Sequence, residues 1–348
     1  MTPAAPAFKI PLIDIRPSNP HAAHQLLTAA TETGFIYLPS SCIPIPPSTL
    51  NTIFALSQSF FKSPLSIKQP TSISSNAAGK NLGWVAQGIE NLDPSTQKHA
   101  DVKEAFNLGE PDLAGNNFEQ PLPTPLQAYE QLLVDFYAQC HELCQILLRL
   151  FAVALGVGEE WFTSRHDRTK GPSGTVLRLL YYPSRHVSAV EGKEGGDMRA
   201  GAHSDYGSLT LLFQQRGQPG LEVKGPGGDW VGVPVDPEGA GERGEGLPVL
   251  VNIGDLLEDW TAGLLKSTVH RVVFPPAEGE GGADRYSIAY FCHPVDEARL
   301  EAVPSDVVKA YAAARKGERK REVVRGDGSV MTARDHLMER LAATYTVK

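Results

Sequence analysis

Cysteine is scarce in this sequence, which excludes a disulfide framework. Only four cysteines occur in 348 residues, Cys42, Cys140, Cys144 and Cys292, whereas small domains held by disulfides are dense in cysteine. Cys140 and Cys144 lie one helical turn apart, but a zinc site would need two further ligands at a matching spacing, and no such pair follows. We therefore expect reduced, buried thiols and a cytoplasmic location.

Long apolar runs and an excess of positive charge are also missing. The most apolar stretch, residues 146–158, is interrupted by Arg149 and is shorter than the ~20 residues that a membrane-spanning helix needs. The first residues carry no charged segment followed by an apolar one, so no secretion signal is expected. Lys plus Arg total 32 against 40 for Asp plus Glu, a net charge of −8. Without a basic field we expect no nucleic-acid partner and no membrane partner, but a small-molecule substrate. The sequence carries no signal of an oligomeric state.

Glycine and proline are abundant, and they divide the chain into elements. The 33 glycines and 27 prolines gather in residues 191–201, 236–248 and 275–284, which we interpret as surface loops. Up to about residue 170 the apolar spacing is mainly helical, and from residue 174 it is mainly that of strands. These patterns favour an antiparallel sandwich or barrel braced by helices, a mainly β fold class. The predicted helices are 20–33, 46–62, 124–155, 304–316 and 333–343, and the predicted strands are 11–15, 34–39, 175–183, 208–214, 221–224, 229–235, 248–254, 267–274 and 285–292.

The longest predicted helix, residues 124–155, has recognisable ends. Thr124 is suited to cap it, Pro125 to its first position and Gly156 to a left-handed cap. Between these ends, apolar residues recur in steps of three and four and form one continuous stripe. The stripe includes Leu126, Tyr129, Leu133, Phe136, Cys140, Leu143, Leu147, Leu150 and Ala154. We expect this stripe to pack on a sheet.

Two of the ten histidines have neighbours that indicate chemistry. His203 and Asp205 are two residues apart on an extended segment, so their side chains share a face. His270 lies on a later predicted strand. Two imidazoles and one carboxylate form the facial triad of non-haem Fe(II) oxygenases, and zinc is a chemical alternative. We interpret the other eight histidines as surface or core residues: His21, His24, His99, His141, His166, His186, His293 and His336.

A second pair of residues indicates a carboxylate receptor. Arg285 and Ser287 share one face of the predicted strand 285–292, and a guanidinium beside a hydroxyl binds a carboxylate well. Fe(II), Asp205, Arg285 and a bound 2-oxo dicarboxylate carry +2, −1, +1 and −2, which sum to zero. A buried site with no net charge avoids the desolvation penalty of a lone ion.

Four ordered motifs give the chain a resemblance to a known family. They occupy residues 203–212, 252–257, 266–273 and 285–287, and they resemble the iron- and 2-oxoglutarate-dependent dioxygenases of the isopenicillin N synthase-like superfamily. Residues 11–15, 34–39 and DVKEAFNLG (101–109) resemble that family's N-terminal region. The resemblance covers about residues 10–345. It implies a double-stranded β-helix (jelly-roll) core with an N-terminal α/β region packed on it. It also implies Fe(II) as the cofactor, and 2-oxoglutarate and O2 as co-substrates.

Within that superfamily the motifs are most similar to the fungal thymine dioxygenases (thymine 7-hydroxylases). The similar segments are LRLLYYP, RAGAHSDYGSLTLLFQ, KSTVHRVV, RYSIAYFCHP and RLAATY. By this resemblance Arg178, Tyr206 and Phe291 line the substrate pocket. From the strand pattern, Phe291 shares a face with Arg285, and Tyr182 shares a face with Arg178. We expect Phe291 to offer its ring to a planar substrate and Arg178 to donate to a carbonyl oxygen.

The resemblance implies a division of labour along the chain. Residues 1–170 would brace the barrel and supply part of the substrate entrance, including residues 76–96. Residues 171–300 would form the jelly-roll core and residues 301–348 the C-terminal helices, all in one compact unit. The expected reaction couples oxidative decarboxylation of 2-oxoglutarate to hydroxylation of a small organic substrate, thymine or a related planar heterocycle.

Three alternatives share the same residues. The chain could be a tailoring dioxygenase that hydroxylates, desaturates or rearranges a fungal metabolite. It could instead be an oxidase like isopenicillin N synthase, which needs no 2-oxo acid and uses its Arg-X-Ser pair for the carboxylate of its substrate. A non-catalytic binding protein on the same scaffold is the third, but neither the triad nor the carboxylate receptor is incomplete here.

Overall fold

The computed structural model of the chain describes residues 8–73, 81–93, 100–184, 198–274, 283–315, 323–324 and 328–344. His99 and His186, most of the predicted loops 191–201 and 275–284, and part of segment 76–96 lie outside these residues. The helices are α1 (Ala22–Glu32), α2 (Pro47–Phe61), α3 (Leu65–Lys68), α4 (Thr124–Gln127), α5 (Glu130–Ala154), α6 (Glu160–Thr163), α8 (Asp255–Trp260), α9 (Asp306–Ala314) and α10 (Ala333–Thr344). The strands are β1 (Phe35–Leu38), β2 (Gly83–Val85), β3 (Glu104–Leu108), β4 (Val176–Tyr182), β5 (Met198–His203), β6 (Leu209–Gln214), β7 (Leu221–Lys224), β8 (Trp230–Gly232), β9 (Val249–Ile253), β10 (His270–Val273) and β11 (Arg285–Cys292).

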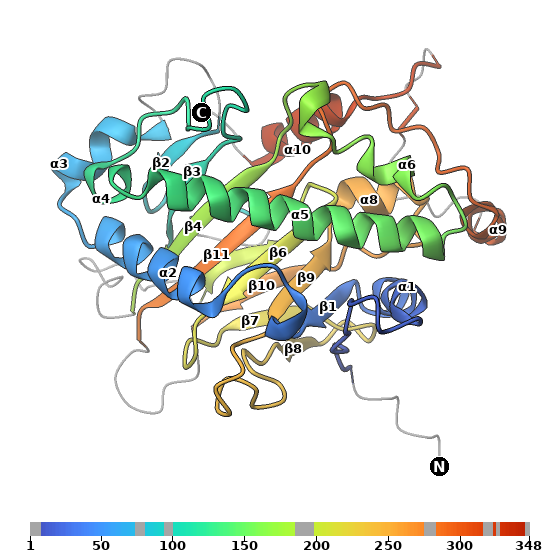
Figure 1. Cartoon of the computed structure of the whole chain (residues 1–348), viewed down its shortest axis with the longest axis horizontal. Coiled ribbons are helices and arrows are strands. Elements are labelled where there is room, and N and C mark those ends of the chain that lie inside the picture. The colour runs from blue at the N-terminus through green and yellow to red at the C-terminus, as the bar shows by residue number, and fades with distance from the viewer. Residues whose placement is uncertain are drawn as a thin grey trace.

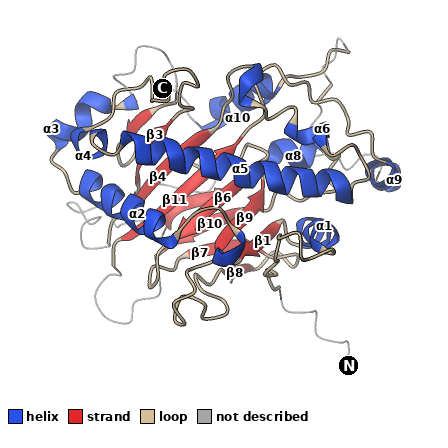
Figure 2. Ribbon diagram, viewed as in Figure 1, coloured by secondary structure: helices blue, strands red, loops and turns tan. Residues whose placement is uncertain are grey.

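The strands form two antiparallel sheets. A seven-stranded sheet has the order β1-β9-β6-β11-β4-β3-β2, and a four-stranded sheet has the order β5-β10-β7-β8. At the centre of the larger sheet β11 pairs with β4 and with β6, so that Arg285 lies opposite Tyr182 and Ala289 opposite Arg178. Figure 2 shows α5 and α2 in front of the strands. The expected antiparallel sandwich braced by helices is confirmed.

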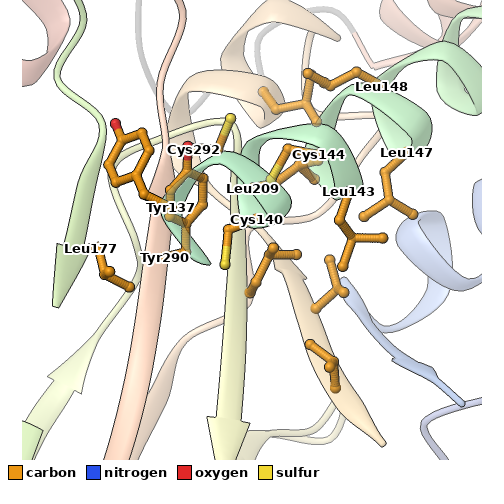
Figure 3. Close-up of a cluster of buried hydrophobic side chains, with 14 of the residues drawn as sticks. Tyr137, Cys140, Leu143, Cys144, Leu147, Leu148, Leu177, Leu209, Tyr290 and Cys292 are labelled. Atoms are coloured by element: carbon orange, nitrogen blue, oxygen red, sulfur yellow. The ribbon is translucent and has the colours of Figure 1, made fainter. Parts of the chain in front are cut away.

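Helix α5 covers one face of the large sheet. Figure 1 shows it lying across the strands, with α2 beside it, and both helices contact β11. The expected stripe is buried at Leu133, Phe136, Cys140, Leu143 and Leu147. In Figure 3 this stripe meets Leu177 of β4, Leu209 of β6 and Tyr290 of β11. The apolar spacing of the sequence therefore predicted the correct packing.

The ends of the 124–155 helix differ from the prediction in one respect. The backbone leaves the helical region at Tyr129 (φ −117°, ψ 16°), which separates α4 from α5. Tyr129 is consequently 44% exposed rather than part of the buried stripe. Thr124 is the first helical residue and makes no side-chain cap, since Pro123 precedes it. Gly156 has φ +68°, as its expected role at the end of the helix requires.

The opposite face of the large sheet packs on the small sheet. The residues between the sheets form a second hydrophobic cluster, which includes Phe35, Leu180 and Ala289 from the large sheet and Val223 and Val272 from the small one. The large sheet is thus covered on both faces. The cavity described below opens into the layer between the two sheets.

Several elements depart from the sequence prediction. The segment 11–15 forms only an isolated bridge between Leu12 and Tyr37. Pro11 has no backbone N–H to donate, so the pairing does not extend into a strand. Residues 198–203, whose first part was expected to be loop, form β5. Strands β2 and β3 and helix α8 were not anticipated. Among the described residues, no helix combines the length and apolar character needed to cross a bilayer.

Candidate active site

Two histidines face each other across neighbouring strands. β5 ends at His203 and β10 begins at His270, and the antiparallel register places them directly opposite. Their ring centroids are 4.4 Å apart. Nδ1 of His203 lies 2.7 Å from the carbonyl oxygen of Gly201, and Nδ1 of His270 lies 3.1 Å from that of Thr268. A hydrogen on each Nδ1 leaves the lone pair of each Nε2 for a metal ion.

Asp205 completes a convergent set of three donors. Its Oδ2 accepts hydrogen bonds from Thr210 Oγ1 and Asn252 Nδ2, each at 2.7 Å. Its Oδ1 lies 3.9 Å from Nε2 of His203 and 3.7 Å from Nε2 of His270. The three donor atoms lie within 4.8 Å of one another. Each ligand therefore has one atom fixed by the protein and the other directed to a shared point, an arrangement that fits a divalent metal.

The protonation states of His203 and Asp205 suit a metal. Burial and the neighbouring His270 lower the pKa of His203 to about 4, which keeps the ring neutral near pH 7. Burial would raise the pKa of Asp205, but the two histidines and the hydrogen bonds from Asn252 and Thr210 outweigh it and lower that pKa overall. Neutral imidazoles and an ionised carboxylate are the forms that bind metal.

Two glycines allow the loop after Asp205 to pack against β9 and α8. A Cβ on Gly254 would lie 2.2 Å from the carbonyl oxygen of Gly207, and a Cβ on Gly207 would lie 2.5 Å from that of Cys292. The close approach lets the N–H of Asp255, the first residue of α8, donate to the carbonyl of Asp205 at 2.7 Å. The motif HSDYGS and the motif NIGDLL are thus in direct contact, and this contact fixes the backbone of the carboxylate ligand.

Arg285 is a buried cation with no carboxylate partner in the described part of the chain. It is 1% exposed, and burial lowers the pKa of its guanidinium. Nη1 donates to Ser287 Oγ at 3.2 Å and Nη2 to Gln214 Oε1 at 3.4 Å, while the Tyr182 ring centroid lies 5.0 Å from Cζ. Its Nε has no hydrogen-bond partner among the same residues. A buried charge with neutral neighbours only is strongly unfavourable, so this site is suited to an anionic ligand.

A cavity of about 740 Å³ adjoins these residues. Its wall includes His203 and Asp205 and all four residues that were expected to contact substrate, namely Arg178, Tyr182, Tyr206 and Phe291. His270, Arg285 and Ser287 do not line it, and each is at least nine-tenths buried. Tyr182 connects the two groups, because it lines the cavity and contacts Arg285.

A buried network of alternating charges forms part of the cavity wall. Nη2 of Arg178 donates to both carboxylate oxygens of Glu90 at 2.7 Å, and Lys103 Nζ lies 3.1 Å from Glu90 Oε2 and 2.7 Å from Asp101 Oδ2. Burial opposes the charge on Lys103, but Glu90 and Asp101 outweigh it and raise the pKa of Lys103. Arg178 therefore lines the cavity, where it already donates to a carboxylate of the protein.

Helix α10 supplies another part of the wall. Leu337, Met338 and Leu341 line the cavity. Arg340 lies over the Tyr206 ring at 4.7 Å, and its Nη2 is 2.9 Å from Asp255 Oδ2. The C-terminal helix thus reaches both the loop that follows Asp205 and the first residue of α8.

Comparisons with known proteins identify the family of the chain. A model of the 2OG-Fe(II) oxygenase superfamily matches residues 173–294, and a model of the non-haem dioxygenase N-terminal region (in morphine synthesis) matches residues 10–131. UPF0676 protein C1494.01 of Schizosaccharomyces pombe is 35% identical over 84% of both chains. The 2-oxoglutarate-dependent dioxygenase htyE of Aspergillus rugulosus is 32% identical over 74% of this chain and 78% of its own.

The chain belongs to the 2OG-Fe(II) oxygenase superfamily. It is a 2-oxoglutarate-dependent dioxygenase that uses Fe(II), 2-oxoglutarate and O2, which sets aside zinc, the oxidase without a 2-oxo acid and the non-catalytic alternative. The full-length thymine 7-hydroxylase of Neurospora crassa in complex with 2-oxoglutarate (α-KG) has a TM-score of 0.75 and 33% identity over 96% of both chains. The same Neurospora enzyme has also been solved with thymine. The expected double-stranded β-helix core and the resemblance to thymine 7-hydroxylase are confirmed.

Some residues of the dioxygenase cavity were not found from the sequence. Glu90 and Lys103 are charged residues of ordinary spacing, which usually indicate a solvated surface. His293, interpreted as a surface or core residue, lines the cavity. Burial and the neighbouring His336 lower its pKa to about 3, and its buried Nδ1 has no hydrogen-bond partner among the described residues. The role of α10 had one signal, the segment RLAATY, which resembles the family but does not show where the helix packs.

Proposed function

We propose that His203, Asp205 and His270 hold Fe(II), and that Arg285 and Ser287 receive the far carboxylate of 2-oxoglutarate. The buried, uncompensated charge of Arg285 carries this proposal, since a bound carboxylate would pair with that charge and accept hydrogen bonds from the guanidinium. When bound, Fe(II) supplies the open positions at which oxidative decarboxylation of 2-oxoglutarate to succinate and CO2 is coupled to substrate hydroxylation. The protein holds the co-substrate, orients the substrate and excludes water.

For the substrate we favour a small planar heterocycle such as thymine. Phe291 offers a ring for stacking, and it lies next but one along β11 from Ala289, which is opposite Arg178. Arg178 has a second guanidinium nitrogen, Nη1, besides the one that donates to Glu90, and this nitrogen can donate to a substrate carbonyl. Tyr182 and Tyr206 complete the polar wall of the cavity. The complex of the Neurospora enzyme with thymine supports this choice.

A larger fungal metabolite is the second candidate. The cavity volume, about 740 Å³, is in the range of sites that hold drug-sized molecules, roughly 300–1,000 Å³. Leu113 and Met338 line the cavity and are more than half exposed, which gives its rim an apolar character. This candidate shares every proposed iron and 2-oxoglutarate residue with the first.

The architecture supports a role for each part of the chain. Residues 1–170 brace the core and contribute Glu90 and Lys103 to the substrate entrance, residues 171–300 carry the iron and 2-oxoglutarate residues, and residues 301–348 add α10 to the wall. We place the enzyme in the cytoplasm without a nucleic-acid or membrane partner. The free cysteines and the net charge of −8 support this location and this absence of partners.

The test is an anaerobic titration of the Fe(II)–2-oxoglutarate complex. Thymine is expected to shift the metal-to-ligand band, and aerobic turnover should yield one hydroxylated pyrimidine per succinate. Uracil, which lacks the methyl group, is the control: it should shift the band without giving that product. A band that responds only to larger planar metabolites would replace the first substrate candidate by the second. Hydroxylated product formed equally well without 2-oxoglutarate would overturn both.

A further inference from the structure

The motif DVKEAFNLG resembles the family's N-terminal region, yet the proposed chemistry does not use it. Its Asp101 is 1% exposed. One oxygen of this carboxylate, Oδ2, binds Lys103 Nζ at 2.7 Å. The other, Oδ1, accepts the backbone N–H of Gly201 at 3.0 Å. This second contact joins residues that are 100 positions apart in the chain and reaches the strand that ends in a metal ligand.

Gly201 lies at an irregularity of β5. His270 pairs with His203, and Val272 pairs with Ala200. Between these pairs β10 advances two residues and β5 three, so β5 contains a bulge. A bulge leaves one residue outside the regular ladder and turns nearby side chains, and glycine has the freest backbone of all residues. The ladder with β10 therefore does not fix Gly201, and Asp101 supplies the missing constraint.

The same glycine fixes the metal ligand. Its carbonyl oxygen lies 2.7 Å from Nδ1 of His203. This contact sets the tautomer and the direction of the ring, and hence where Nε2 points. Asp101 thus acts on His203 through the N–H and the carbonyl of one residue. Because Lys103 binds both Asp101 and Glu90, and Glu90 holds Arg178, the same network continues into the cavity wall.

We propose that Asp101 is a positioning residue for the iron centre, which holds the bulged Gly201 and thereby aims His203 at the metal. The inference rests on the proposed triad, but it concerns a residue outside it. It also gives Asp101 a function distinct from that of Glu104, the other acidic residue of the DVKE segment. Glu104 binds Lys68 Nζ and Trp84 Nε1, each at 2.8 Å, and neither of these contacts involves Gly201.

The test compares Asp101→Ala with Glu104→Gln, a matched variant from the same segment that also breaks a buried ion pair. The full-length apoprotein is titrated without O2 and without 2-oxoglutarate, with Co(II) as the probe. Asp101→Ala should weaken Co(II) binding about 10-fold or more, as loss of outer hydrogen-bond partners does at metal sites. Glu104→Gln should leave it within about twofold, because a separate pair contributes independently. Thermal unfolding of both apoproteins reports their folding.

A folded Asp101→Ala protein with wild-type Co(II) affinity would overturn the proposal. Wild-type protein that binds no Co(II) would instead overturn the triad itself, so the two failures are distinguishable. A second measurement needs no variant and decides the matter if Asp101→Ala does not fold. In wild-type apoprotein the Gly201 amide should be protected from hydrogen exchange, although no regular strand pairing holds it. Exchange at the rate of an unprotected glycine amide would show that Asp101 does not hold it.

Discussion

Strands β4 and β11 have two faces of opposite character. Toward α5 they present Leu177, Leu179 and Tyr290, all fully buried in an apolar layer. On the opposite face they carry Arg178, which lines the cavity and pairs with Glu90, and Arg285, which is buried without a carboxylate partner among the described residues. Adjacent residues of one strand therefore serve different purposes. One face stabilises the sheet, and the other holds charges in place at the expense of stability.

The largest effect is expected where the site depends on a single group. Asp205→Ala should abolish metal binding and turnover together, because it removes the only carboxylate ligand of the triad. The apoprotein should stay folded but lose about 1–3 kcal/mol of stability, because Thr210 and Asn252 lose their buried acceptor. Metal titration and urea unfolding check both points.

A suitable control for Asp205→Ala is His336→Gln, which breaks a buried contact between His336 and Asp259 (3.2 Å) away from the triad. This variant should keep its metal affinity. Full metal affinity in Asp205→Ala would mean that the iron is held elsewhere.

Arg285→Ala should produce the next largest effect, on the co-substrate. Loss of one partner of a buried, hydrogen-bonded charge pair costs about 2–5 kcal/mol, so the KM for 2-oxoglutarate should rise about 30-fold or more. Succinate formation as a function of 2-oxoglutarate concentration measures it.

Arg271→Ala is the matched control for this variant. Arg271 lies on β10, is partly exposed and pairs with Glu222 at 2.7 Å. Its loss should leave the KM for 2-oxoglutarate unchanged. An equal rise in both variants would show that the effect is not specific to the buried arginine.

The two faces can be compared directly with one substitution on each. Leu143→Ala, on α5 in the apolar layer between this helix and the sheet, should lower the free energy of unfolding by about 2–5 kcal/mol and leave the KM values unaltered. Phe291→Ala should do the reverse: stacking geometry contributes about 0.5–1.5 kcal/mol beyond buried area, so substrate binding should weaken roughly tenfold with a smaller change in stability. Urea unfolding and substrate titration give both quantities. If Phe291→Ala destabilised the fold as much as Leu143→Ala, the distinction between the faces would fail.

The smallest expected effect is a pH dependence of stability. His166 is buried against Phe162 and Ser208, and burial lowers its pKa from 6.5 to about 4. Below pH 6.5 the unfolded chain binds a proton that the folded protein does not, so stability falls as the pH drops from 6.5 to about 4 and is constant above. His166→Gln should flatten part of this slope in urea unfolding at about pH 7.5 and about pH 5. An unchanged slope would assign it to other buried histidines.

The sequence predicted the apolar face of the large sheet, which packs under α5, better than the face that carries Arg178 and Arg285. Apolar spacing is a local signal, and it located α5, its stripe and most strands of both sheets. Apolar spacing could not show the break between α4 and α5 at Tyr129, because that break depends only on the φ and ψ angles of this residue. β5 was missed in part because Met198–Gly201 has the composition of a loop, and its pairing with β10 is long-range.

For the site, residues in short motifs were predictable and their partners were not. His203, Asp205 and His270 were selected for their chemistry and spacing, and the strand register brings them together. Glu90 meets Arg178 across 88 positions, a contact that no local pattern contains. Charged residues such as Lys103 look like surface residues until a fold buries them beside opposite charges.

The place of α10 in the chain has a consequence for biosynthesis. The three residues that we assign to iron lie between positions 203 and 270, whereas the helix that walls the cavity spans Ala333–Thr344. Synthesis proceeds from the N-terminus, and folding begins while the ribosome is still at work. A nascent chain therefore contains its complete ligand set before α10 adds its part of the cavity wall, so that metal can bind before the substrate cavity is finished.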